Sequence, residues 1–180
     1  AFWIWNKSEH IQQFKLTNGN CCFNHIVGLP LKDGKEYPLF DYEKILYDNL
    51  IMSNSYSFKD KHLWIKKATG LGVTEFMLRF MAWLCVKDDS YKNSQMCIVT
   101  GPNQDIAIKL IKRLKGIFEP KLGIYFQDKE AALNLNGCSI EAYPSNHLDS
   151  YRALTNPKFI LLDECDMFRK SEQDDVRHVS

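Results

Sequence analysis

Two groups of residues, far apart in this sequence, have the types and spacing needed for phosphate chemistry. The first is the segment KATGLGVT, Lys67 to Thr74, in which two glycines and a final threonine follow an apolar run. The second is the pair Asp163 and Glu164, which directly follows the apolar run FILL. Glycines let backbone N–H groups curl around an anion, and hydroxyl and carboxylate oxygens are ligands that Mg²⁺ prefers. The two groups together predict a site for a phosphorylated ligand and a metal ion.

The first segment is a variant of the phosphate-binding loop GxxxxGK[ST]. It matches at Gly72 and Thr74, but Lys67 stands where the first glycine is usual and Val73 where the lysine is usual. Gly70 and Gly72 still permit a curled backbone, and the helix expected after them presents its positive end to an anion. We therefore expect ATP phosphates to bind here, with the missing charge supplied by Lys67. The loop residues expected to contact the nucleotide are Lys67, Ala68, Thr69, Gly70, Leu71, Gly72, Val73 and Thr74.

The two acids have distinct expected roles. Asp163 would hold Mg²⁺ through water and Thr74 would ligate it, and Glu164 would orient and deprotonate the water that attacks the γ-phosphate. A solvated strand end explains two acids equally simply, and a glycine turn between a strand and a helix is common. The joint occurrence of both features in a strand and helix context favours the site.

The elements that must position these residues follow an alternating pattern of strands and helices. Such alternation, with strands apolar on both faces, predicts an α/β fold built on a parallel sheet covered by helices. Ligands bind beyond the carboxyl ends of the strands in such sheets, so the loop and the acids should share one edge. The predicted helices are 42–52, 73–86 and 103–118, and the predicted strands are 62–67, 95–102, 123–128, 138–144 and 158–164.

Composition describes an ordinary globular chain. The 180 residues are 45% hydrophobic, which excludes a disordered chain. The net charge is only +1, so the overall charge gives no reason to expect electrostatic attraction to nucleic acid or membrane. We expect an N-terminal arm over 1–36, one domain over 37–180, no membrane span and a cytoplasmic location. The scattered cysteines predict reduced thiols, although Cys21, Cys22 and His25 could supply part of a metal site.

Four segments resemble the ATPase domain of the large terminase subunit, the motor that packages viral DNA into capsids. They are PLFDYEKILYDNL, KATGLGVTEFMLRF, IVTGPNQDIAIKLIKRLKGIF and EAYPSNHLDSYRALTNPKFILLDECDMF, and they cover most of 37–168. Some terminases have a loop with lysine at its first position and none after the glycine, as here. The resemblance implies a P-loop NTPase-type sheet, mainly parallel, with helices on both faces, and ATP and Mg²⁺ as ligands.

The resemblance also implies roles and partners outside the loop. Arg152 would be an arginine finger that reaches a neighbouring subunit. Phe40 and Tyr42 would either stack on adenine or simply pin the helix to the core, and Glu43 stands where a glutamine commonly reads the base edge. Implied partners are double-stranded DNA, the small terminase subunit, and further copies in a homo-oligomeric ring on a capsid portal. A terminase would continue beyond Ser180 with a coupling motif and a nuclease domain, so we expect a truncated chain that binds nucleotide better than it hydrolyses it.

Two other interpretations remain open. DECD at 163–166 resembles the box of a superfamily 2 RNA helicase branch, although the remaining helicase motifs do not match. Val73 could instead mark an inactive loop in a nucleotide-binding or interaction domain. The helix over 103–118 carries Lys109, Lys112, Arg113 and Lys115, which form either a solvated face or a stripe that contacts the DNA backbone.

Overall fold

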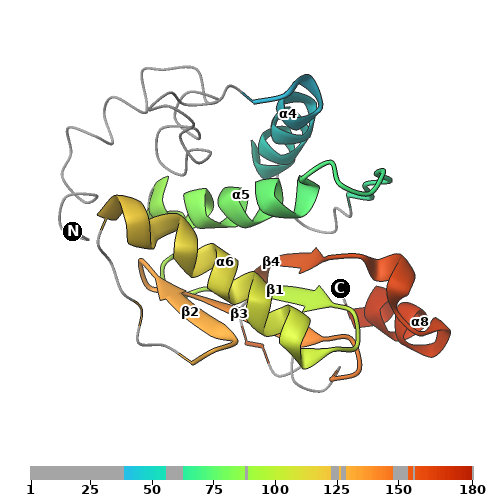
Figure 1. The fold of residues 1–180 in the computed structure, drawn as a ribbon. Coiled ribbons are helices and arrows are strands. Elements are labelled where there is room, and N and C mark those ends of the chain that lie inside the picture. The colour runs from blue at the N-terminus through green and yellow to red at the C-terminus, as the bar shows by residue number, and fades with distance from the viewer. Residues whose placement is uncertain are drawn as a thin grey trace.

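The computed structural model describes residues 39–55, 63–87, 89–122, 126, 129–147, 154–155 and 157–179. They form an α/β fold, a four-stranded sheet with helices around it (Figure 1). In chain order the elements are α4 (Asp41–Ser55), α5 (Val73–Lys87), the 3₁₀ turn η1 (Asp89–Tyr91), β1 (Gln95–Thr100), α6 (Gln104–Leu122), β2 (Ala132–Leu135), β3 (Cys138–Pro144), β4 (Pro157–Leu162), the 3₁₀ turn η2 (Cys165–Met167) and α8 (Lys170–Val179).

The sheet is mostly parallel, as the alternating pattern predicts. Its strand order is β2-β3-β1-β4, with β1 parallel to both β3 and β4. The ladder continues one residue past β4, where Asp163 N–H donates to the Val99 carbonyl over 2.9 Å. Because β1 and β4 run in the same direction, the acids that follow β4 lie at the edge of the sheet where β1 ends.

One antiparallel pair was not predicted. β2 joins β3 through the turn Asn136–Gly137, and both turn residues have positive φ, 52° and 77°. An Asn-Gly dipeptide between two short apolar stretches is a strong hairpin signal, because both residues tolerate the left-handed conformation that the tight turn requires. The sequence therefore contained the information for this hairpin.

The core lies mainly between one face of the sheet and the helices. Met96 and Ile98 of β1 belong to the main cluster together with residues of α4, α5 and α6. Cys97 and Val99, which alternate with them along β1, point to the other face and pack with Phe168, which follows η2. The helix α5 is buried along nearly its whole length, which is why its sequence is apolar at almost every position.

The predicted helices correspond to α4, α5 and α6, and the predicted strands 95–102, 138–144 and 158–164 to β1, β3 and β4. The strand predicted over 62–67 is wrong for its described part, 63–67, which has no regular secondary structure. Leu63, Trp64 and Ile65 are 47%, 62% and 40% exposed. A strand needs a neighbour for its backbone hydrogen bonds, and no described strand pairs with this segment. The strand predicted over 123–128 lies outside the described residues except for Phe126, which is not in a strand.

The four cysteines in the described part of the chain are free thiols, in line with the expectation of reduced cysteines. Cys85, Cys97 and Cys138 are buried, and Cys165 is half-buried. Cys21, Cys22 and His25, like the arm predicted over 1–36, lie outside the described residues. Among the described residues, no helix combines the length and the apolar character needed to cross a membrane.

Candidate functional site

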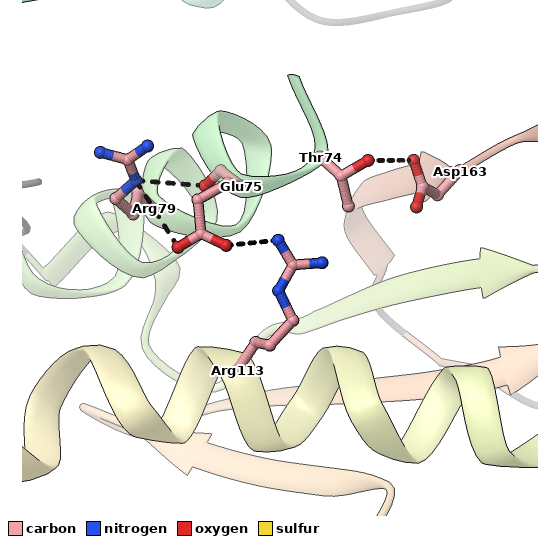
Figure 2. A network of polar contacts seen from close by, with 5 residues as sticks. All are labelled: Thr74, Glu75, Arg79, Arg113 and Asp163. Carbon is pink, nitrogen blue, oxygen red and sulfur yellow. Dashed lines mark hydrogen bonds and ion pairs between the residues drawn. The ribbon is translucent and has the colours of Figure 1, made fainter. Parts of the chain in front are cut away.

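The fold brings the two predicted halves of the site into contact. Thr74 lies in the first turn of α5, and Asp163 directly follows β4. The Thr74 hydroxyl donates a hydrogen bond to Asp163 Oδ1 over 2.8 Å, across a sequence separation of 89 residues (Figure 2). Asp163 is 8% exposed, so its carboxylate is held at the helix start rather than extended into solvent. The predicted pairing of a loop hydroxyl with a strand-end acid is present.

The loop before α5 owes its course to two glycines. Gly70 and Gly72 have φ values of +83° and +75°, a region that side chains with a Cβ rarely adopt. A Cβ at either position would meet no atom within 4 Å, so backbone conformation and not space requires glycine here. Phe76 N–H donates to the Gly72 carbonyl over 3.0 Å, which closes the first turn of α5. The first N–H groups of the helix are left for another acceptor.

Val73, which stands where the motif lysine is usual, is buried in the core at 7% exposure. The Val73 side chain belongs to the main core cluster. Lys67, at the other end of the loop, is half-buried, whereas the neighbouring Lys66 is exposed. Lys67 therefore remains the candidate cation of the loop.

The start of α4 contacts the loop. The Tyr42 hydroxyl donates to the Leu71 carbonyl, and the Phe40 and Tyr42 rings stack with their centroids 5.7 Å apart and their planes at 9°. Phe40 is 61% exposed, so an aromatic surface is available next to the loop. Burial raises the pKa of Tyr42, and the nearby Glu43 carboxylate raises it further, so the phenol stays a donor.

Glu43, which the resemblance places at a base-reading position, is a buried residue of α4. Its side chain is 2% exposed, and its Oε2 accepts the Phe40 N–H over 3.0 Å, which caps the start of α4. Arg79 of α5 is 3% exposed and interacts electrostatically with Glu43. Burial lowers the pKa of Arg79, while the neighbouring acids Glu75 and Glu43 raise it. The Glu43 carboxylate thus serves as a buried cap, and its contact with a base stays a prediction, as do those of Phe40 and Tyr42.

Glu164, the expected catalytic base, has an unusual backbone. It adopts φ 54° and ψ 43° and precedes η2, whose Met167 N–H donates to the Glu164 carbonyl over 2.9 Å. The other described non-glycine residues with positive φ are Asn93 and Asn136, a residue type that tolerates this region. For glutamate the conformation costs about 1–2 kcal/mol. Glu164 is exposed and directly follows Asp163, which contacts the start of α5.

The residues present suit Mg²⁺. Thr74 Oγ1 and the Asp163 carboxylate are oxygen ligands, and Mg²⁺ characteristically takes one or two protein ligands and fills its octahedron with water and phosphate oxygens. Within the described ranges no group of three or more His, Cys, Asp or Glu residues could hold a metal ion. A two-ligand magnesium site that also needs a phosphate is therefore the arrangement that this chemistry allows.

A network of charges that sequence reasoning missed borders the site. Glu75, next to Thr74 in the first turn of α5, lies 2.5 Å from Arg113 Nη2 and 3.9 Å from Arg79 Nε (Figure 2). Arg79 Nε also donates to the Glu75 carbonyl over 3.3 Å. The spacing of Glu75 and Arg79 by four residues is a helical pairing signal, whereas nothing in the sequence pairs Glu75 with Arg113 of α6.

The basic stripe of α6 is divided by these contacts. Arg113 faces Glu75, and Lys115 is only 9% exposed and donates to the Lys129 carbonyl over 3.0 Å. Lys109 and Lys112 remain exposed. Arg152, the expected arginine finger, lies outside the described residues, so its position relative to Glu164 stays a prediction.

Comparison with known proteins adds no family to this geometry. No protein-family model matches the chain, and a search of curated proteins returns no match.

Proposed function

We propose that this chain is an ATP-binding and ATP-hydrolysing domain. The observation that supports it most directly is the hydrogen bond between Thr74 and Asp163, because a hydroxyl at a helix start and an acid at a strand end are the two protein groups that a nucleotide-bound Mg²⁺ needs. The left-handed glycines before α5 supply the curled backbone that such a ligand also needs.

Each residue then has a defined task. Backbone N–H groups of the Gly70–Gly72 segment and the first turn of α5 bind phosphate oxygens, and Lys67 neutralises their charge. Thr74 and Asp163 hold Mg²⁺, which supplies charge neutralisation between the outer phosphates. Glu164 orients the attacking water and accepts its proton. Phe40 and Tyr42 offer the base a stacking surface.

The finer proposal is a motor domain of a terminase-like large subunit that drives packaging of viral double-stranded DNA. It rests on the resemblance of the four sequence segments, and it includes a ring of copies on a capsid portal, a small-subunit partner and a DNA backbone contact. Within α6, Lys109 and Lys112 are the exposed cations for that contact. In this arrangement Arg152 of one subunit would complete the site of the next.

Titration with a fluorescent, nonhydrolysable ATP analogue in the presence of Mg²⁺ tests the nucleotide site. The matched pair is Lys67→Ala and Lys66→Ala, since the two lysines are adjacent and differ in burial. We expect Lys67→Ala to weaken binding by about tenfold or more, as for loss of a charged hydrogen bond, and Lys66→Ala to bind like the wild type.

Two results would overturn the proposal. Absence of binding by the wild type at millimolar nucleotide would show that the loop is inactive. Equal behaviour of the two lysine variants would remove Lys67 from the site. Hydrolysis is a separate readout: Glu164→Gln should keep binding and lose turnover, because an amide keeps the shape of the side chain but accepts no proton.

A further inference from the structure

The first turn of α5 combines two features that oppose each other. The free N–H groups at a helix start attract anions, and the proposed phosphate site depends on them. Glu75, however, places a carboxylate in that same turn, beside Thr74. Its side chain is 32% exposed, so its charge is only partly screened by water. An unpaired Glu75 would repel the polyphosphate that the turn is expected to bind.

Two arginines offset this charge. Arg113 of α6 reaches Glu75 Oε2 at 2.5 Å, and Arg79 lies 3.9 Å from Oε1 (Figure 2). Arg79 is enclosed: its Nη1 is buried and has no hydrogen-bond partner among the described residues. Arg113 is different, because 48% of its side chain is exposed and it belongs to another helix. Removal of Arg113 would therefore change the charge beside Thr74 with little effect on the buried core.

We propose that Arg113 is a positioning residue for the nucleotide site, acting through Glu75: by neutralising this carboxylate it keeps the start of α5 receptive to the polyphosphate of Mg²⁺-ATP. The proposal rests on the proposed function. It also removes Arg113 from the set of α6 cations available to DNA, whereas the adjacent Lys112 is exposed and stays available.

A purely structural role for the Glu75–Arg113 pair predicts the opposite effect of Glu75→Gln on nucleotide binding. If the Glu75–Arg113 pair served only to tie α5 to α6, Glu75→Gln and Arg113→Met would each loosen the helix start and weaken nucleotide binding alike. If Arg113 acts by neutralising Glu75, removing the carboxylate itself should tighten binding. The direction of the Glu75→Gln effect therefore separates the two roles.

The experiment titrates the fluorescent ATP analogue with Mg²⁺ into the wild type, Arg113→Met, Glu75→Gln and the double variant. Neighbouring charges near a protein surface interact by a few kcal/mol or less. We therefore expect Arg113→Met to weaken binding of the ATP analogue roughly fivefold to tenfold at low salt, where screening is weak. Glu75→Gln should bind at least as tightly as the wild type, and the double variant should return to within about twofold of it. The control Lys129→Met removes one exposed charge outside α5 and α6 and should leave binding unchanged.

The outcomes are distinct. Weaker binding by Glu75→Gln, failure of the double variant to recover, or equal effects of Arg113→Met and Lys129→Met would each overturn the proposal while leaving the nucleotide site intact. No binding by the wild type would overturn the proposed function and this proposal with it. If Arg113→Met does not fold, Arg113→Lys keeps the charge and should bind within about twofold of the wild type, and a larger loss counts against neutralisation.

Discussion

The contact between Thr74 and Asp163 should be measurable as a coupling energy in the absence of any ligand. The perturbation is a double-mutant cycle with Thr74→Ala, Asp163→Ala and the pair. Its basis is the 2.8 Å hydrogen bond from a half-buried hydroxyl to a carboxylate that is 8% exposed. This bond fixes the start of α5 to the end of β4, so its loss should lower the free energy of unfolding.

The expected size follows from the type of bond. Hydrogen bonds to charged groups contribute about 1.5–3 kcal/mol, and the half-buried position of Thr74 favours the lower end, so we expect a coupling of about 1.5 kcal/mol. In a domain of this length each kcal/mol shifts Tm by about 2–4 °C, so Thr74→Ala should lower Tm by about 3–6 °C. Thr74→Ser keeps the hydroxyl and should retain most of the stability.

Urea unfolding followed by circular dichroism gives the four free energies of the cycle. The control is Thr69→Ala, the same truncation in the same loop but at an exposed position. It should change the free energy of unfolding by no more than about 0.5 kcal/mol. A coupling energy near zero, or equal losses for Thr74→Ala and Thr69→Ala, would refute the view that this bond holds the two halves of the site together.

Two further predictions concern stability. Burial, with Glu141 nearby, raises the pKa of Cys97 to about 12, so the folded thiol stays neutral while the unfolded thiol ionises. The free energy of unfolding should thus fall as pH rises above roughly 8.5. In urea unfolding, Cys97→Ala should make this fall less steep by about 1.4 kcal/mol per pH unit. Equal dependence of the free energy of unfolding on pH in the variant and the wild type would contradict the prediction. Glu172 is 7% exposed and accepts a hydrogen bond from Ser145 Oγ over 2.7 Å. Glu172→Ala should therefore lower the free energy of unfolding, measured by thermal unfolding, by about 2–3 kcal/mol, whereas the control Asp166→Ala at an exposed position should lower it by about 0.5 kcal/mol or less. Similar losses for the two variants would refute a stabilising role for this buried bond.

The elements that were predicted correctly are those whose signals are local. The apolar run of α5 and the amphipathic pattern of α6 determine helices almost independently of context. The acids after β4 were expected beside the loop because a parallel strand was predicted to lead into each. The described part of 62–67 is not a strand, so only the half of this argument that concerns β4 holds, although Thr74 and Asp163 do meet.

The features that the sequence analysis missed depend on contacts between distant segments of the chain. An apolar run such as Leu63–Ile65 looks like a strand, but a strand exists only when a neighbour accepts its hydrogen bonds, and that is a property of the whole sheet. The helix-capping role of Glu43 was not predicted from the sequence, and the base contact that the resemblance implies for it stays a prediction. The Glu75–Arg113 pair depends on how α5 and α6 pack, so no spacing within one helix could reveal it.

Under the proposed function, the hydrogen bond between Thr74 and Asp163 also affects how Mg²⁺ would bind. While Thr74 donates to Asp163, the same hydroxyl and carboxylate oxygens are already positioned within one hydrogen bond of each other. Two oxygen ligands held this close need little rearrangement to bind one small cation. The two side chains therefore lose their conformational entropy mainly when the protein folds, and little more when the metal binds. The Thr74 oxygen keeps its lone pairs while its proton is donated to Asp163, so the hydroxyl can serve as a metal ligand with this hydrogen bond intact. The proposed function then predicts that the affinity for nucleotide with Mg²⁺ depends on both side chains. Nucleotide without the metal should bind more weakly and depend less on them.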